Sequence, residues 1–486
     1  MILGIDIGTS VTKAALIDRD GTSHNHASTN SALITGPNGH VEQDLDDVMD
    51  SVARVAREVA HAASEPIEAV ALTAQGDGLW LRDAEGAAVR NPLSWMDARA
   101  SDIVARWGEG GADSVTDRVF RLTGSGVFPG CHAALLAWLA EHEPESFEKA
   151  AVAGYCADAV LQRLTGEITV DASDASLPFL DVRTREYVDE ALELCGIANW
   201  RHLLPAPAPV DATFSLDAAG AELLGLPLGT PVSSGPYDLQ ACSFGAGAEH
   251  AGDGTVIIGT TLACQVFTHD TTNKPEFEPA GMWLCTPDPD LYLRVMPSMV
   301  GTAGLDWLLS MFQLTPSDLT RLLDESPAGA NGVRALSFLS PAGERAPFVD
   351  PLARGQFTGL TIASTRADVV RALCESVVFA ARHCLEVLGF DGELSASGGG
   401  VRSSAWAQLL ADVMGRPIWI PHEAQVGIRG AAQVAWKRLG TPVDTDAWRT
   451  QRTRLDPNLD AHAALEAGYR EYLADLAAAR AQWNRA

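Results

Sequence analysis

Residues 4–18, GIDIGTSVTKAALID, decide the fold of this chain. Alternating apolar residues lead into a glycine turn and out into a second apolar run, which predicts two strands joined by a hairpin. Residues 253–270, DGTVIIGTTLACQVFTHD, repeat this pattern of strand, small-residue turn and strand. The weak duplication predicts an α/β fold with two halves rather than one continuous sheet, and we expect domains at residues 1–247 and 248–486 with a cleft between them.

Helical patterns separate the predicted strands. A buried strand that runs into a Gly-Pro turn is expected at residues 232–236. Apolar spacing and helix propensity predict helices over residues 44–63, 132–165 with a break near residue 143, 301–313, 317–326, 366–388, 403–414 and 447–486.

Composition narrows the classes of partner. The 486 residues include 35 Lys+Arg and 63 Asp+Glu, a net charge of −28, so the chain repels polyanions, and we expect neither nucleic acid nor a membrane as partner. Eight cysteines without a CxxC pair are typical of small buried residues in a reducing cytosol. No basic segment precedes the first strand and no apolar run reaches the ~18 residues of a membrane span. We therefore expect a cytoplasmic protein.

The turn at Gly8 carries groups suited to phosphate. Glycine lets backbone N–H groups approach phosphate oxygens, and Thr9 and Ser10 can donate hydroxyls. Asp6 beside the turn can hold a hydrated Mg²⁺. A plain β-turn would also fit these residues.

Two further glycine turns lie in the second half. Gly259, Thr260 and Thr261 repeat the hydroxyl-and-amide device, and could grip a nucleotide tail from the other side. Gly399 and Gly400, followed by an amphipathic helix, can pack flat against a purine or cap a helix over phosphate. A flexible linker is the alternative interpretation of this third turn.

Asp238 follows the buried strand at the expected start of a helix, where the helix dipole stabilises a carboxylate. It could serve only as an N-cap, because aspartate is common there. Its place at the junction of the two halves favours a catalytic role.

Read in order, ten segments of the chain resemble the FGGY family of carbohydrate kinases, over residues 2–436. They are GIDIGTSVTKAALID, AQGDGLWL, WMDARA, EHEPE, GPYDLQACSFGAG, VIIGTTLACQ, GLDWLL, FLSPAGERAPFVDP, GQFTGL and SGGGVRSSAWAQLLADVMGRPI. The resemblance implies two actin-like (ribonuclease H-like) ATPase domains that close on ATP–Mg²⁺ and a small polyol or ketose.

The same resemblance implies a role for each candidate residue. Asp238 matches the general base, and Asp6 and Asp238 are the expected metal ligands. ATP contacts are implied at Gly8, Thr9, Ser10, Gly259, Thr260, Thr261, Gly399 and Gly400, and substrate contacts at Gln75, Gly76, Asp77, Trp95 and Asp238.

Two positions depart from the family pattern. Leu135 stands where the family usually carries a lysine, and His132 nearby either faces the sugar or is a core histidine. The substrate loop has Asp77 where D-xylulose kinases typically have a Met-His pair, which replaces an imidazole by an acceptor-only carboxylate.

The motifs most resemble those of erythritol-type polyol kinases, and we expect an erythritol-like acceptor. D- or L-xylulose is the alternative, and glycerol kinases are less similar. An actin-like ATPase without sugar kinase activity is the alternative of another class, although it would not need Asp77, Trp95 or Asp238. A homodimer is compatible with the sequence.

Overall fold

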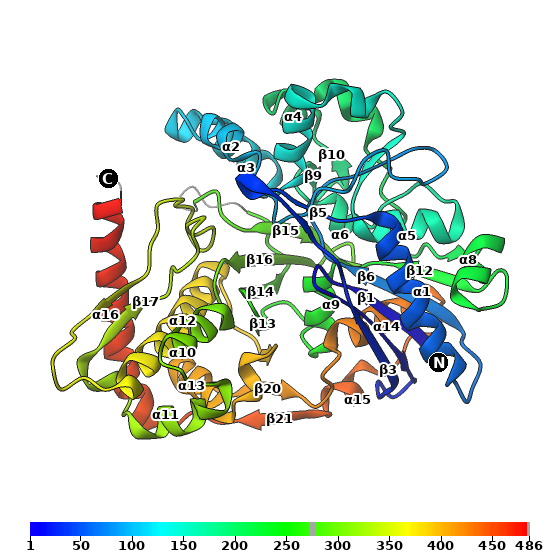
Figure 1. Cartoon of the computed structure of the whole chain (residues 1–486). Coiled ribbons are helices and arrows are strands. Elements are labelled where there is room, and N and C mark those ends of the chain that lie inside the picture. The colour runs from blue at the N-terminus through cyan, green and yellow to red at the C-terminus, as the bar shows by residue number, and fades with distance from the viewer. Residues whose placement is uncertain (273–277, 484–486) are drawn as a thin grey trace.

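The computed structural model describes residues 1–272 and 278–483, and its strands form two large sheets (Figure 1). The first is six-stranded, in the order β11 (Phe214–Ser215), β12 (Pro231–Ser234), β6 (Ala69–Ala74), β1 (Ile2–Ile7), β2 (Val11–Ile17), β3 (Ser23–Asn30). The second is seven-stranded, in the order β15 (Met282–Cys285), β16 (Tyr292–Ser298), β14 (Leu262–Thr268), β13 (Gly254–Ile258), β19 (Leu394–Ser397), β20 (Ile418–Pro421), β21 (Arg452–Leu455).

The two sheets share one plan. β1 pairs antiparallel with β2 and parallel with β6, and β13 pairs antiparallel with β14 and parallel with β19. The next strand outward, β12 or β20, is again parallel in both sheets. The duplication predicted from the two glycine hairpins is therefore present in the strand order.

Helices cover these sheets. They are α1 (Leu45–His61), α2 (Ser101–Trp107), α3 (Val115–Thr123), α4 (His132–His142), α5 (Cys156–Thr165), α6 (Ala172–Ala175), α7 (Asp189–Leu194), α8 (Ala218–Leu224), α9 (Asp238–Gly245), α10 (Thr302–Met311), α11 (Leu319–Glu325), α12 (Arg366–Leu388), α13 (Ser404–Met414), α14 (Val426–Arg438), α15 (Thr445–Arg449) and α16 (Leu459–Trp483). The smaller sheets pair β4 (Ile34–Thr35) with β5 (Val41–Glu42), β7 (Trp80–Arg82) with β8 (Val152–Gly154), β9 (Leu180–Asp181) with β10 (Glu186–Tyr187), and β17 (Arg334–Leu336) with β18 (Gln356–Thr358). None of the helices in the described ranges is long and apolar enough to cross a membrane.

Two predicted helices are divided in the structure. The segment 132–165 forms α4 and α5 with strand β8 between them, because β8 pairs with β7 far away in the sequence. The segment 447–486 contains β21 before α16, because β21 completes the edge of the second sheet beside β20. The last three residues of that segment lie outside the described ranges.

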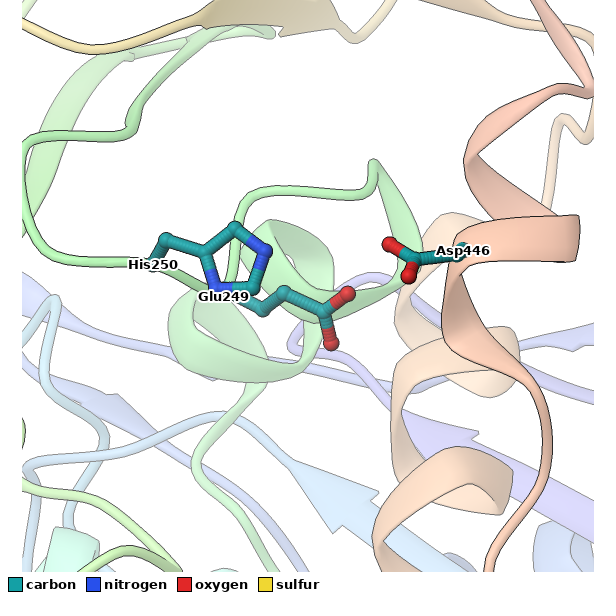
Figure 2. A group of neighbouring side chains, drawn as sticks. All are labelled: Glu249, His250 and Asp446. Atoms are coloured by element: carbon teal, nitrogen blue, oxygen red, sulfur yellow. The ribbon is translucent and has the colours of Figure 1, made fainter.

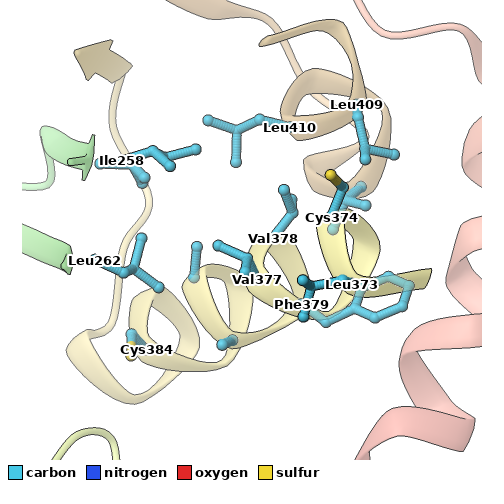
Figure 3. Close-up of a cluster of buried hydrophobic side chains, with 14 of the residues drawn as sticks. Ile258, Leu262, Leu373, Cys374, Val377, Val378, Phe379, Cys384, Leu409 and Leu410 are labelled. Carbon is cyan, nitrogen blue, oxygen red and sulfur yellow. The ribbon is translucent and has the colours of Figure 1, made fainter. Parts of the chain in front are cut away.

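The long helix α12 organises the core of the second half. Its buried face meets β14 and α13, and Figure 3 shows Val377 and Val378 on the side of the helix that faces Ile258 and Leu410. Close packing of this kind removes apolar surface from water and is the main stabilising contribution. α16 closes the same core with buried side chains such as Trp483, so the C-terminal helix is packed rather than solvated.

Helix α14 joins the two halves. It follows β20 of the second sheet, yet its apolar face packs on β1 and β6 of the first sheet (Figure 1). The fit requires a glycine, because a Cβ on Gly4 would lie 2.4 Å from Cγ2 of Ile428. α14 also packs against α9, the helix that begins with Asp238.

Candidate active site

Asp238 is the first residue of α9, immediately after the turn that ends β12. Tyr237 occupies the N-cap position and makes no side-chain cap, so Asp238 is not the N-cap. Its Oδ1 is buried and has no hydrogen-bond partner in the described structure. Burial, with a further contribution from Asp6, raises the pKa of Asp238 to about 8. An unpartnered buried carboxylate with a raised pKa is the state expected of a proton acceptor.

Asp6 lies on β1, close enough to Asp238 for its charge to raise the pKa of Asp238. Burial raises the pKa of Asp6, and Lys13 partly opposes that change. Lys13 is the cross-strand partner of Asp6, with its Nζ 3.9 Å from Asp6 Oδ2. The N-terminus of α14 also borders this carboxylate, since a Cβ on Gly427 would lie 3.5 Å from Asp6 Oδ2.

The Asp6–Asp238 pair fits a divalent cation. Burial raises the pKa of Asp238 and the negative charge of Asp6 raises it further, while Asp238 Oδ1 lacks a donor among the described residues. Hard cations such as Mg²⁺ prefer carboxylate oxygens and commonly take only one or two of them. A bound Mg²⁺ would relieve both the repulsion and the missing contact.

The turn at Gly8 is hydrogen-bonded to two residues predicted to contact the substrate, Gln75 and Trp95. Gly8 donates its N–H to the Val11 carbonyl at 3.1 Å, whereas Thr9 and Ser10 donate theirs to no other described residue. The Thr9 hydroxyl donates to Gln75 Oε1 at 2.6 Å and accepts from Trp95 Nε1 at 2.8 Å. The Thr9 hydroxyl therefore ties Gln75 to Trp95, and its backbone N–H has no partner among the described residues.

The two glycine turns of the second half lie side by side. A Cβ on Gly400 would be 2.5 Å from Cγ2 of Ile258, the residue just before Gly259. Gly399, in contrast, has open space where its Cβ would stand. Thr260 and Thr261 keep free backbone N–H groups within the described structure, as Thr9 and Ser10 do. The packing brings the second and third turns together at one end of β13 and β19.

The loop that the sequence predicts to contact the substrate is tightly packed around Asp77. This residue has φ of 54°, in the left-handed region that non-glycine residues rarely adopt. The preceding Gly76 is required because a Cβ there would lie 2.3 Å from the Tyr237 ring. Burial raises the pKa of Asp77 to about 7, and Arg345 opposes that rise. Strain and an unfavourable carboxylate environment together mark a functional position.

An arginine that no sequence pattern indicated holds the turn before Asp238. Arg438 of α14 donates to the Ser234 carbonyl at 2.7 Å and to Ser233 Oγ at 3.1 Å. It also contacts Asp171 Oδ2 at 2.5 Å. Ser173 Oγ in turn accepts from the Tyr237 N–H at 2.9 Å. Arg438 lies after the last of the family motifs, so the sequence offered no signal for these contacts.

His132 and Leu135 are core residues. Both are fully buried in α4, and His132 packs against Tyr155 with ring centroids 4.7 Å apart. Burial, together with the charge of Arg82, lowers the pKa of His132 to about 3, so the ring is neutral. A lysine at position 135 would place its charge in an apolar cluster.

A separate group of ligand-type side chains lies after α9. Figure 2 shows Glu249, His250 and Asp446, whose ligand atoms lie within 4.8 Å of one another. His250 and Asp446 are exposed. The Glu249 carboxylate accepts from Gln433 Nε2 at 2.9 Å and lies 3.9 Å from Arg449. This arrangement ties α14 and the segment containing α15 to the end of α9.

The two sheets of shared plan, with their helices, define a two-domain, actin-like ATPase fold. Comparison with known proteins agrees: the model of the FGGY family of carbohydrate kinases, N-terminal domain, matches residues 1–245, and that of its C-terminal domain matches residues 254–438. The chain therefore belongs to the FGGY family of carbohydrate kinases. It is a phosphotransferase with an alcohol group as acceptor.

Named relatives span nearly the whole chain. The chain is 32% identical over 463 residues to the erythritol kinase of Brucella abortus, covering 90% of this chain and 88% of the relative. It is 26% identical to the probable L-xylulose kinase of Pasteurella multocida, covering 97% of both chains. The crystal structure of ligand-bound xylulose kinase from Lactobacillus acidophilus superimposes with a TM-score of 0.91 at 24% identity, covering 100% of this chain and 99% of that one. The last comparison concerns the fold alone.

Proposed function

We propose that the protein transfers the γ-phosphoryl group of ATP to a hydroxyl of a small polyol, with an erythritol-like acceptor favoured. The observation that carries the proposal is the Asp238 carboxylate, buried and unpartnered beside Asp6 at the start of α9. Phosphoryl transfer depends mainly on positioning and charge stabilisation, and one carboxylate base is enough for the acceptor.

In the proposed reaction, Asp238 accepts the proton of the attacking hydroxyl as that oxygen forms its bond to the γ-phosphorus. The bond from phosphorus to the β–γ bridging oxygen breaks, and ADP leaves. The raised pKa of Asp238 matches it to a weakly acidic alcohol, because a stronger base gains more from the proton transfer.

Asp6 and Asp238 would hold Mg²⁺, directly or through water. The ion would supply positive charge beside the phosphate oxygens. Lys13, the cross-strand neighbour of Asp6, adds a cation on the same side of the hairpin.

Carbohydrate kinases of this family use ATP, and we assign its contacts to the three glycine turns. Backbone N–H groups suit phosphate because they are fixed donors that need no net positive charge. This matters in a chain with a charge of −28, which gains nothing from its overall field when it binds ATP. The residues are Gly8, Thr9, Ser10, Gly259, Thr260, Thr261, Gly399 and Gly400. We place the reaction in the cytoplasm, where ATP is supplied and the eight cysteines remain free thiols, as they are here.

The choice of acceptor rests on the substrate loop and on the relatives. Gln75, Gly76, Asp77 and Trp95 would contact the substrate, with Asp77 accepting hydrogen bonds from hydroxyls. The relative named as an erythritol kinase is 32% identical, and a second is named as a probable L-xylulose kinase at 26%. Xylulose, D- or L-, is therefore the second candidate.

An acceptor panel tests the proposal. ADP release would be measured with ATP–Mg²⁺ and each of erythritol, other tetritols and pentitols, D- and L-xylulose, D-ribulose and glycerol. We expect the highest kcat/KM for erythritol and much weaker turnover of glycerol, because a site built for hydroxyls leaves polar groups unpaired with a shorter acceptor. A preference for xylulose would replace the favoured acceptor by the second. Absence of acceptor-dependent ADP release across the panel would reject the proposed function.

A further inference from the structure

Arg345, in the segment that joins β17 to β18, reaches the substrate loop of the other half. Its guanidinium carbon lies 5.4 Å from the centroid of the Trp95 ring and 4.9 Å from that of Phe128. Both rings belong to the N-terminal half, so the contacts cross between the halves. Cations over aromatic faces are attracted by the ring quadrupole, and this fixes the guanidinium at the Trp95 side of the loop.

Hydrogen bonds fix the backbone of Arg345 and the inner part of its side chain. The Glu344 carboxylate accepts from the Arg345 N–H at 2.8 Å, from the Met299 N–H at 2.9 Å and from Ser298 Oγ at 2.8 Å. Arg345 Nε donates to the Pro297 carbonyl at 2.9 Å. A side chain fixed at its backbone and at Nε has lost most of its rotamer freedom before any ligand binds.

The outer nitrogens of Arg345 are free. Within the described structure Nη1 and Nη2 donate to no protein acceptor, and the Asp77 carboxylate accepts from no protein donor. Arg345 and Asp77 nevertheless affect each other's pKa. Burial raises the pKa of Asp77 and lowers that of Arg345, and the charge of each residue opposes the shift of the other. They form no ion pair within 4.0 Å in this part of the chain. Arg345 thus keeps two unused donor groups and Asp77 an unused acceptor group, and the two side chains are close enough for each charge to affect the pKa of the other.

We propose that Arg345 binds the sugar substrate, donating from Nη1 and Nη2 to oxygens of the acceptor molecule that Asp77 holds from the other side. Arg345 would thus be a specificity-determining residue contributed by the C-terminal half to a site otherwise built by the N-terminal half. This inference rests on the proposed kinase function and adds the residue that recognises the acceptor. It fits neutral acceptors that carry several hydroxyls, because one donor-only group and one acceptor-only group can both be satisfied by hydroxyls.

The end of β16, which accepts the Arg345 hydrogen bond through Pro297, is followed by residues joined to the second glycine turn. Gly301 donates its N–H to the Thr260 carbonyl at 3.0 Å and Thr302 donates to the Gly259 carbonyl at 2.7 Å, only a few residues after Pro297. Trp95 on the opposite side donates to Thr9 of the first turn. Arg345 therefore contacts Pro297 and Trp95, whose neighbourhoods are hydrogen-bonded to the second and the first of the turns assigned to phosphate.

The test compares wild type, Arg345→Ala, Arg345→Lys and the control Arg321→Ala, whose side chain is exposed on α11. Steady-state kinetics would be measured with erythritol, with the butanetriols that lack one of its hydroxyls, and with D-xylulose. We expect Arg345→Ala to raise the KM for the preferred acceptor by about 10- to 100-fold, the effect of one or two charge-assisted hydrogen bonds. The KM for ATP should change by less than about twofold. Guanidinium chloride at millimolar concentration should restore part of the loss in Arg345→Ala and none in wild type or the control.

The butanetriols distinguish binding of the acceptor by Arg345 from a purely structural contact, or latch, that Arg345 makes between the two halves. Loss of one particular hydroxyl should weaken binding to wild type but not further weaken binding to Arg345→Ala, because the two changes remove the same contact. A latch between the halves would instead lower turnover equally for all acceptors. Equal acceptor KM in wild type and folded Arg345→Ala, or additive losses at every hydroxyl, would overturn the inference. If Arg345→Ala does not fold, the same comparison with Arg345→Lys decides. An inactive wild type would reject the proposed function instead.

Discussion

At the scale of single residues, the site combines carboxylates whose environments oppose ionisation. Asp6 comes from the first strand and Asp238 from the ninth helix; burial raises the pKa of both, and the charge of Asp6 raises the pKa of Asp238 further. Such an arrangement costs stability in the free protein, which is typical of sites built to bind a cation and to accept a proton.

The raised pKa of Asp238 has a defined consequence for pH dependence. A base must be unprotonated, so kcat/KM for the acceptor should fall about tenfold for each pH unit below about 8 when Mg²⁺ is limiting. Saturating Mg²⁺ should move the inflection to lower pH, because a nearby cation favours the carboxylate. Asp238→Asn should lose turnover by about 10² or more while still binding ATP. A wild-type rate independent of pH between 5 and 9, or near-normal turnover of Asp238→Asn, would contradict the role of Asp238 as base.

The sequence indicated some site residues better than others. Lys13 could have been found, because the hairpin at Gly8 places it directly opposite Asp6 in the register. Arg345 and Arg438 could not, because each acts on the other half of the molecule through contacts that no local pattern encodes. The motif FLSPAGERAPFVDP contains Arg345, but nothing in it indicates that this side chain contacts Trp95 and Phe128.

At the scale of elements, α12 shows how local signals and tertiary packing reinforce each other. Thr365 and Asp368 form a capping box at its N-terminus, and the helix ends at Gly389, whose φ is 74°. These signals, with apolar spacing, predicted 366–388 correctly. In contrast, β8 and β21 were not predicted, because their pairing partners are distant in sequence and their own residues do not differ from the helices around them.

Asp368 is expected to matter for stability rather than catalysis. It accepts from Ser326 Oγ at 2.7 Å and from Asn331 Nδ2 at 2.8 Å, besides capping through Thr365. Asp368→Ala should lower the free energy of unfolding by about 2–3 kcal/mol, from the lost cap and the unsatisfied donors. The matched control is Asp324→Ala, an exposed position on α11. Equal effects of the two substitutions in urea unfolding would contradict this assignment.

The same residue predicts how stability changes in acid. Burial would raise the pKa of Asp368, but the hydrogen bonds from Ser326 and Thr365 outweigh it and lower the pKa to about 2, against 3.8 for an unperturbed aspartate. Because the folded pKa is the lower one, its contribution is complete above about pH 4 and is lost as pH falls toward 2. The stability difference between wild type and Asp368→Ala should shrink over that range.

At the scale of the whole molecule, the two halves are not independent bodies laid side by side. α14 belongs to the second half by sequence and to the first sheet by packing, and it contacts the helix that carries Asp238. The duplicated glycine hairpins were sufficient to predict two halves with the same plan. They could not predict this exchange, because the apolar face of α14 does not specify which sheet it covers.

If the protein is an alcohol phosphotransferase, ATP is consumed to phosphorylate the acceptor and is not merely hydrolysed. The most direct measurement follows ADP and phosphorylated acceptor together, by an ADP assay and phosphorus NMR of one reaction with ATP–Mg²⁺ and the preferred acceptor. We expect equal molar amounts of ADP and phosphorylated acceptor, with little inorganic phosphate, and very slow ADP formation when the acceptor is omitted. ADP and inorganic phosphate formed at the same rate with and without acceptor would contradict it.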